Sequence, residues 1–294
     1  MAVTKKVEKK SSPSAAKKAP KKRTAKRMSL TRHKPSDLLS DYAILIYGEQ
    51  GIGKTTLINT FPKVYSFMFD PNDSYAYYMD TCSNWIDFKD IQNQFMSIEH
   101  NFKAAHIDNA LVAYEYALDY ACEKFGFDHP GGQNDYGASW NKVKRVFIPP
   151  LREILLSKYG FLVSCHVAEK DFTTLSGQKY NKIAPDLPKQ AYQFLTSQIY
   201  NIWYYHYVGD ERWLQIVGDE HIVAKNRMKG HFTTKKGEPI HKIPMGRSED
   251  EAFENLMKAF NNEQMEAYRP TFKEKKQSEF KKKPVAKKMA KTKR

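Results

Sequence analysis

A glycine-rich stretch over residues 48–55 carries residue types that bind phosphate groups. It reads Gly48-Glu-Gln-Gly51-Ile-Gly53-Lys54-Thr55 and fits the pattern G-x-x-x-x-G-K-[ST]. Glycines let such a loop wrap so that its backbone N–H groups face phosphate oxygens, and the helix that follows adds the positive end of its dipole. We expect Lys54 to reach the β- and γ-phosphates of ATP and the Thr55 hydroxyl to bind Mg²⁺. The residues expected to contact the nucleotide are Gly48, Glu49, Gln50, Gly51, Ile52, Gly53, Lys54, Thr55 and Thr56.

The flanks of this loop decide between a phosphate site and a chance glycine-rich turn. The apolar segment AILIY precedes the loop and is typical of a strand, and the segment TTLIN that follows is typical of a helix. A strand, a glycine-rich loop and a helix in this order are the context that the motif requires. The sequence therefore predicts a nucleotide-binding P-loop.

Hydrolysis of ATP needs acids near the bound phosphates. Asp108 is the carboxylate nearest the end of an expected strand over 102–107, where it can bind Mg²⁺; alternatively it caps the helix that follows. Asp70 and Asp73 follow an expected strand over 64–69, where a carboxylate can orient the attacking water. The alternative for this pair is an ordinary Pro-Asn-Asp turn.

His166 ends the apolar segment GFLVSCH, which we expect to form a buried strand over 160–166. In parallel α/β sheets the ligand lies beyond the carboxyl ends of the strands. A histidine there can hydrogen-bond the γ-phosphate and sense its presence. The alternative is a half-buried histidine with no such role.

These residues must be held by alternating strands and helices. We expect further strands over 42–47, 198–208, 213–217 and 221–224, and helices over 54–60, 87–96, 108–125, 136–157 and 250–260, with an interruption at Pro149-Pro150 and a polar loop over 167–187. Strands separated by helices indicate βαβ units and a parallel sheet, while the short turns after residue 208 indicate an antiparallel edge. The predicted fold class is α/β with a P-loop core.

The charge of the chain is concentrated at its two ends. Residues 1–35 hold 13 Lys or Arg and one acid, and residues 269–294 hold 12 and two, whereas residues 36–268 hold 23 basic and 30 acidic residues. Tails with so few large apolar residues are expected to be disordered around one nucleotide-binding domain over 36–268. Lysine clusters of this density favour binding of nucleic acid by counterion release, with solubility or targeting as alternatives.

Membrane insertion and disulfide chemistry are not expected. The chain has no apolar run of about 18 residues, and its three cysteines have neither C-x-x-C spacing nor an even number. We expect a reducing compartment, the cytoplasm, or the host cytoplasm if the protein is viral.

The P-loop and several other segments together resemble the phage and prophage RecA-like ATPases of the single-strand-annealing recombination group. The resemblance runs over about residues 40–262. Besides the P-loop it rests on Ile107-Asp108-Asn109, Asp135-Tyr136-Gly137-Ala-Ser-Trp140, Ser164-Cys165-His166, Pro185-Asp-Leu-Pro188 and Ala224-Lys225-Asn226-Arg227.

That resemblance implies a RecA-like core, ATP hydrolysis, oligomerisation into a ring or filament, and action on single-stranded DNA with recombination or replication proteins. It also implies that Lys225 and Arg227 act on the nucleotide of a neighbouring subunit; without it they are an ordinary surface segment.

The chain departs from the family pattern in two places. Where the family has an apolar strand ending in Asp-Thr before a second Asp-Asn, this chain has Ala105-His106 before Asp108-Asn109, and where the family often has an acid pair after the second strand, it has Asp70-Pro71-Asn72-Asp73. The resemblance thus places Ala105 at the position of the Walker B acid, and a nucleotide-binding, DNA-associated scaffold with little turnover is the alternative function. A small-molecule kinase is a third reading, although the segment 167–187 lacks the arginines that an acceptor site needs.

Overall fold

The computed structural model describes residues 34–70, 77–132, 135–174, 177 and 179–269. The chain divides into two units, Met1–Lys34 and Pro35–Arg294, and the fold below is that of the second. Asp73 and the two predicted tails, apart from residues 34, 35 and 269, lie outside the described residues.

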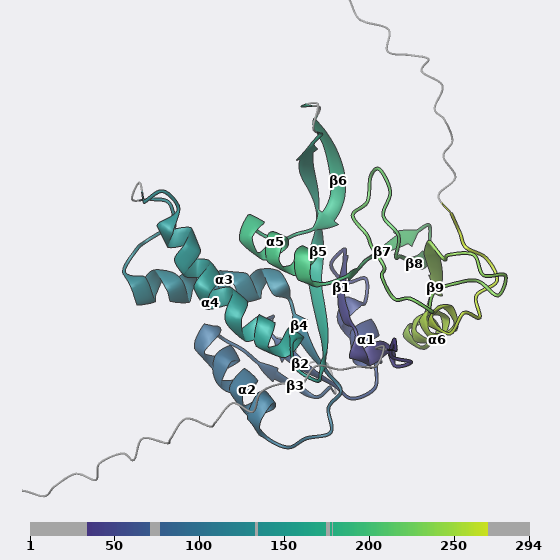
Figure 1. The fold of residues 1–294 in the computed structure, drawn as a ribbon, viewed down its shortest axis with the longest axis horizontal. Helices are drawn as coiled ribbons and strands as arrows, with labels where there is room; N and C mark the ends of the chain where they lie inside the picture. The colour runs from purple at the N-terminus through teal and green to yellow at the C-terminus, as the bar shows by residue number, and fades with distance from the viewer. Residues whose placement is uncertain (1–33, 71–76, 133–134, 175–176, 178, 270–294) are drawn as a thin grey trace, which may run out of the picture. The chain divides into compact units, whose positions relative to one another are not determined.

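Strands and helices alternate along most of the second unit (Figure 1). In chain order they are η1 (Leu39–Asp41), β1 (Ala43–Gly48), α1 (Lys54–Asn59), β2 (Val64–Met68), β3 (Met79–Thr81), α2 (Trp85–Ser97), β4 (Ala104–Asp108), α3 (Ala110–Phe125), α4 (Ala138–Leu155), β5 (Gly160–Thr173), β6 (Lys179–Pro185), α5 (Lys189–Gln198), β7 (Asn201–Val208), β8 (Glu211–Gln215), β9 (Lys242–Gly246) and α6 (Glu249–Phe260).

The strands form a sheet in the order β3-β2-β4-β5-β1-β7-β8-β9, with β6 paired to β5. All neighbours from β3 to β7 run parallel, and β7-β8-β9 are antiparallel. The predicted α/β fold class, with a mainly parallel sheet and an antiparallel edge, is confirmed. Because β1, β4 and β5 are adjacent and parallel, residues that end these strands gather at one edge.

Two hydrophobic clusters cover the two faces of the sheet. The first packs α2, α3, α4 and α5 against one face, with Trp85, Tyr114 and Phe147 among its fully buried side chains. The second packs α1 and α6 against the other face, around Trp203 and Phe260. Since β1 lies between both clusters, alternate residues of its apolar segment face opposite helical layers, and the segment has no polar face.

Several elements differ from the sequence prediction. The segment 167–187, expected as a polar loop, is an antiparallel hairpin in which β5 continues to Thr173 and pairs with β6 (Figure 1). Its side chains are mostly exposed or half-buried, so it lacks the apolar alternation that reveals a strand against a core. The expected strand over 221–224 makes one isolated bridge, at Ile222, and a second bridge lies just beyond it, at Lys225.

The expected interruption of the helix over 136–157 does not occur. Pro149 and Pro150 lie inside α4, and the helix is continuous from Ala138 to Leu155. Phe147, Leu151 and Ile154 are buried on one side of this helix. Their burial offsets the cost of two missing backbone donors.

The start of β5 leaves no room for a side chain at Gly160. A Cβ atom there would lie 1.7 Å from the carbonyl oxygen of Ser40. We expect Gly160→Ala to lower the free energy of unfolding by about 2–3 kcal/mol in urea denaturation, because the backbone of η1 must move. Gly132→Ala is the matched control, since its nearest atom is at 3.4 Å and an ordinary contact results. Equal stability of the two variants would contradict this close approach.

Candidate functional site: a phosphate-binding cleft at the carboxyl ends of three strands

The P-loop lies between β1 and α1 in a conformation that depends on its glycines. Gly51 and Gly53 have φ angles of 77° and 97°. A Cβ on Gly48 would lie 2.1 Å from the carbonyl oxygen of Tyr205. The Lys54 ammonium donates hydrogen bonds to the carbonyl oxygens of Gly48 (3.0 Å) and Glu49 (2.7 Å), and burial lowers the pKa of Lys54. The loop thus holds its lysine folded against its own backbone.

A cleft of about 550 Å³ opens in front of this loop. It brings together the expected residues Lys54, Thr55, Asp70, Asp108 and His166. Its other lining residues are Gln50, Gly51, Gly53, Thr56, Met68, Asn109, Leu111, Val112, Arg212 and Glu249. Gly48, Glu49 and Ile52, also expected at the nucleotide, do not line it: Gly48 is the last residue of β1, the Glu49 side chain is exposed, and Ile52 is buried in the second hydrophobic cluster.

Asp108 stands at the carboxyl end of β4, facing the P-loop. The Thr55 hydroxyl donates a hydrogen bond to one carboxylate oxygen of Asp108, and the Ser164 hydroxyl donates one to the other. Asp108 is only 6% exposed. The first turn of α1 and strand β5 therefore both contact the carboxylate that ends β4.

The assignment of Ala105 to the position of the metal-binding acid is wrong. Ala105 lies inside β4, opposite Tyr65 and Phe161, and is fully buried in the first hydrophobic cluster. The strand continues to Asp108, so an acid does end it, whereas the sequence predicts that residue 108 begins the next helix. Nor does Asp108 cap α3: the N-cap is Asn109, whose side-chain oxygen accepts from the Val112 N–H at 3.0 Å.

A chain of buried polar side chains supports Asp108 from within the sheet. The Nε2 atom of His106 lies 3.2 Å from the Ser164 hydroxyl, and its Nδ1 atom lies 3.0 Å from the Ser66 hydroxyl. Because Ser164 donates its hydrogen to Asp108, His106 is the donor to Ser164. Burial lowers the pKa of His106. These residues come from three strands, and no local sequence signal joins them.

Asp70 lies across the cleft from the P-loop, just after β2. It accepts a hydrogen bond from the Asn109 side-chain amide. Burial and the nearby Asp108 raise the pKa of Asp70, while His166 and this hydrogen bond lower it less. The result is a carboxylate that accepts a proton more readily than an exposed aspartate.

Arg212 is a cation of the cleft that the sequence analysis did not find. It lies on β8, where the pairing with β9 is irregular between Arg212 and Trp213. One guanidinium nitrogen donates to the carbonyl oxygen of Arg247 at 2.8 Å, and its buried Nε has no hydrogen-bond partner among the described residues. Arg212 lies beside the P-loop because β8 pairs with β7, which pairs with β1. The residues next to Arg212 in the sequence do not indicate that it lines the cleft.

Lys225 and Arg227 do not reach the cleft of their own chain. Lys225 pairs through its backbone with Ile202 at the amino end of β7, and the Arg227 N–H donates to the Asn201 side chain at 3.0 Å. Both cations lie over the ring of Tyr200, at 5.6 Å and 5.1 Å from its centre. Since β7 runs parallel to β1, they lie at the opposite edge of the sheet from the P-loop. A role at a neighbour's nucleotide remains a prediction.

The donor set at the cleft fits Mg²⁺ shared with phosphate oxygens. A hydroxyl and a carboxylate, those of Thr55 and Asp108, already lie within hydrogen-bonding distance of one another. Mg²⁺ prefers oxygen ligands and usually binds through one or two carboxylates together with substrate phosphates and water. In the described part of the chain no cluster of three or more His, Cys, Asp or Glu offers an all-protein metal site.

The contrast between Ala105 and Asp108 gives a direct test. We expect Asp108→Asn to lower ATP hydrolysis by about 100-fold or more, because the cleft loses its metal-binding charge. Ala105→Asp should give no gain in turnover and should lower the free energy of unfolding by about 3 kcal/mol or more, because it buries a charge in the core.

Steady-state hydrolysis and urea denaturation measure the two effects. Asp119→Asn, on the exposed side of α3, is the matched control for Asp108→Asn. A stable Ala105→Asp variant with faster turnover would restore Ala105 to the metal site.

The chain was compared with curated proteins, with solved structures and with protein families. No curated protein matches the chain. Among solved structures, the RadB recombinase is similar with a TM-score of 0.34 and 12% identity over 60% of this chain and 80% of that one. A KaiC-like protein from the archaeon Pyrococcus horikoshii OT3 has a TM-score of 0.38 and 12% identity over 70% and 86%. At these values neither structure says anything about activity.

The family match covers the site itself. Residues 40–228 match the family described as AAA domain, which is more than half of the chain and includes the P-loop, Asp108, His166 and Arg212. This chain belongs to the AAA domain family and carries its nucleotide-binding P-loop domain.

Proposed function

We propose that this protein binds ATP with Mg²⁺ and hydrolyses it in a reaction coupled to single-stranded DNA, in phage-type recombination, replication or repair. The observation that carries the proposal is the convergence of Lys54, Thr55, Asp108 and His166 on one cleft in front of the P-loop. Each provides a group that phosphoryl transfer needs: a cation, a hydroxyl, a carboxylate and a hydrogen-bonding imidazole.

Some residues of the cleft bind the nucleotide and its metal ion, and one accepts a proton. Lys54 exchanges the carbonyl oxygens of Gly48 and Glu49 for oxygens of the β- and γ-phosphates, which compensate its charge better than neutral dipoles. Mg²⁺ held at Thr55 and Asp108 would neutralise charge on the phosphates. Asp70 accepts the proton of the attacking water, and its raised pKa makes it a stronger base for that step. His166 hydrogen-bonds the γ-phosphate.

Charge supports nucleic acid as the partner. The formal net charge is +15, and the two terminal segments hold 25 of the 48 Lys and Arg. Such segments bind the phosphate backbone without reading its sequence. In the part of the chain that the structure describes, no helix is long and apolar enough to cross a membrane. Assembly into a ring or filament and action with recombination or replication proteins in the cytoplasm belong to the same proposal.

The alternative of a DNA-associated scaffold without turnover loses its main support. It rested on Ala105 in place of the Walker B acid, and the carboxylate of Asp108 now occupies that strand end. A scaffold would keep nucleotide binding and DNA binding but show no hydrolysis.

The first test is ATP hydrolysis by the full chain with and without a single-stranded DNA oligonucleotide. We expect turnover that rises with DNA and falls about 100-fold or more in Lys54→Ala, because the cation on the β- and γ-phosphates is lost. Lys229→Ala is the control for loss of an exposed lysine outside the cleft. ATP binding without turnover, with DNA binding retained, would replace this proposal by the scaffold.

Arg212 provides a second test, since it can stabilise charge on the transferred phosphoryl group within one chain. We expect Arg212→Gln to lower kcat by about 1000-fold, the lower end of the effect of a supplied arginine. Arg247→Gln is the matched control, because its side chain pairs with Asp210 in solvent. If a neighbour's Arg227 is required instead, mixing Lys54→Ala with Arg227→Gln will restore activity that neither variant has alone, and Arg212→Gln will turn over normally.

A further inference from the structure

Three exposed lysines stand side by side at the sheet edge opposite the P-loop. Lys63 and Lys103 directly precede β2 and β4, and Lys158 lies two residues before β5. These strands are neighbours in the sheet, and the Lys103 N–H donates to the Lys63 carbonyl oxygen while the Gly160 N–H donates to the Lys103 carbonyl oxygen. The backbone ladder itself therefore fixes the spacing of the three side chains.

The lysines line a pocket of about 170 Å³ that contains no acid. Its other residues are His100, Asn101, Phe102 and Tyr159. In the described ranges none of the three ammonium groups takes part in an ion pair; the Lys158 ammonium lies over the Tyr159 ring at 5.1 Å. An uncompensated group of three cations attracts an anion with several oxygens, and a phosphate is the commonest such group in a nucleic acid.

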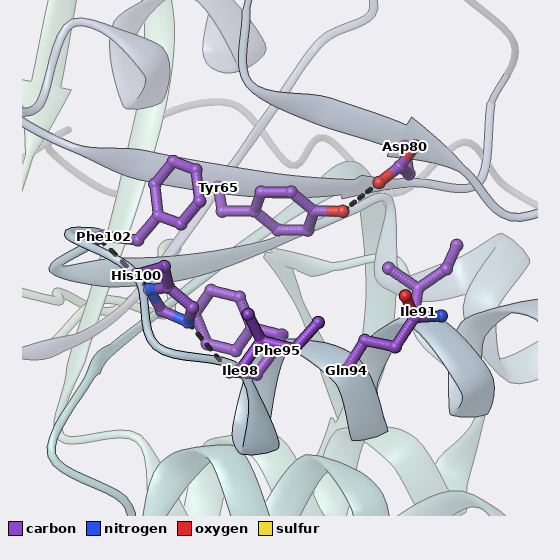
Figure 2. Close-up of a pocket in the computed structure, with 8 residues that line it drawn as sticks. All are labelled: Tyr65, Asp80, Ile91, Gln94, Phe95, Ile98, His100 and Phe102. Carbon is purple, nitrogen blue, oxygen red and sulfur yellow. Dashed lines mark hydrogen bonds between the residues drawn. The ribbon is translucent and has the colours of Figure 1, made fainter.

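Figure 2 shows an aromatic pocket, whose volume is about 340 Å³. It adjoins the basic pocket and shares His100 and Phe102 with it. Its aromatic rings come from β2, α2 and the segment before β4. Phe102 lies 5.1 Å from the Tyr65 ring and 5.3 Å from the exposed Tyr78 ring. Flat rings that line a pocket open to solvent offer faces on which a nucleobase stacks.

His100 is held in place as part of this wall. Its Nδ1 accepts a hydrogen bond from the Phe102 N–H at 3.2 Å, and its Nε2 donates to the Phe95 carbonyl oxygen at 2.8 Å. The ring also stacks on Tyr159, 5.1 Å away at 27°. The junction between the two pockets is therefore rigid, and a ligand that spans both meets preformed walls.

The end of the aromatic pocket that lies away from the lysines carries a carboxylate and an amide instead of cations. Asp80 lies at the rim, and Gln94 extends into the pocket from α2 (Figure 2). The Tyr65 hydroxyl donates a hydrogen bond to Asp80, and burial together with this bond raises the pKa of Tyr65, so the hydroxyl keeps its proton. Among the described residues, the other carboxylate oxygen of Asp80 has no hydrogen bond to a side chain and can accept from an amino or imino group of a base.

We propose that these two pockets form one site for a nucleotide unit of single-stranded DNA, with its phosphate on Lys63, Lys103 and Lys158 and its base stacked beside Phe102 and Tyr65. The order of groups matches the ligand: cations, aromatic faces, then hydrogen-bonding groups for the base edge. The carboxylate at the far end sets the direction, because it repels a phosphate there. The site deepens the proposed function and rests on it for the identity of the nucleic acid.

The test compares two fluorescently labelled 20-mers with the full chain: oligo(dA), and a strand of the same length with abasic units throughout. The variant Lys63→Gln/Lys103→Gln/Lys158→Gln should weaken binding of both probes and reduce the slope of log K against log salt by about 0.7, the value for loss of one phosphate contact on a single strand. Its control is Lys229→Gln/Lys235→Gln/Lys236→Gln, with the same loss of charge on exposed residues elsewhere.

The base is tested through the aromatic pocket. Phe102→Leu should weaken binding of oligo(dA) by about 5-fold or more and leave the abasic strand unchanged, because stacking needs a base. Phe125→Leu is the matched control, a partly exposed phenylalanine that also lies near lysines. Photo-crosslinking of a 5-iodouracil oligonucleotide should label Tyr65, His100 or Phe102.

Other outcomes overturn the site. Equal behaviour of the two lysine triples, or equal effects of Phe102→Leu on both probes, would remove it while leaving DNA-stimulated hydrolysis intact. A change of oligomeric state in Phe102→Leu with unchanged DNA binding would assign the pocket to a second copy of the chain. Failure of the unaltered protein to bind either probe would overturn this site and the DNA part of the proposed function together.

Discussion

The carboxylate of Asp108, held between two hydroxyl groups, is the constraint on which the site depends. Thr55 comes from the first turn after the P-loop and Ser164 from β5, so the two hydrogen bonds connect three adjacent strands at their carboxyl ends. A buried carboxylate without such partners would be costly. The register of β4 against β5 must therefore be kept, and with it the positions of Asp70, Asn109 and His166 around the cleft.

The P-loop could be predicted because its chemistry is local. Its glycines, lysine and threonine are adjacent in sequence, and the flanking strand and helix need no distant partner to be recognised. The end of β4 could not be predicted in the same way. The segment Ala104–Asp108 is buried on both sides, yet it contains His106, whose polar ring is satisfied only by Ser66 and Ser164 on neighbouring strands. The sequence pattern there is that of a weak strand, expected to end at residue 107, one residue before the acid that closes β4.

The same difference between local and distant partners explains the other errors. The hairpin of β5 and β6 pairs with itself and has no hydrophobic face, so its pattern is that of a loop. Arg212 reaches the cleft only because β8 pairs with β7, which in turn pairs with β1. The strand over 198–208, by contrast, is predictable, because its apolar residues alternate between two buried faces: Trp203 and Tyr205 lie in one cluster, and Ile202 and Tyr204 lie in the other. The periodicity of apolar residues indicates which side chains are buried, but it does not indicate which strand is the hydrogen-bonded neighbour.

The position of Glu249 in the wall of the cleft has a consequence for which stretches of the sequence encode the site. The family segment ends at residue 228, yet this wall is completed by the first turn of α6, which the chain adds afterwards. A fragment cut at the family boundary would keep the P-loop and lose Glu249 from the lining of the cleft. The P-loop and this part of the wall are thus encoded in separate stretches of the same gene.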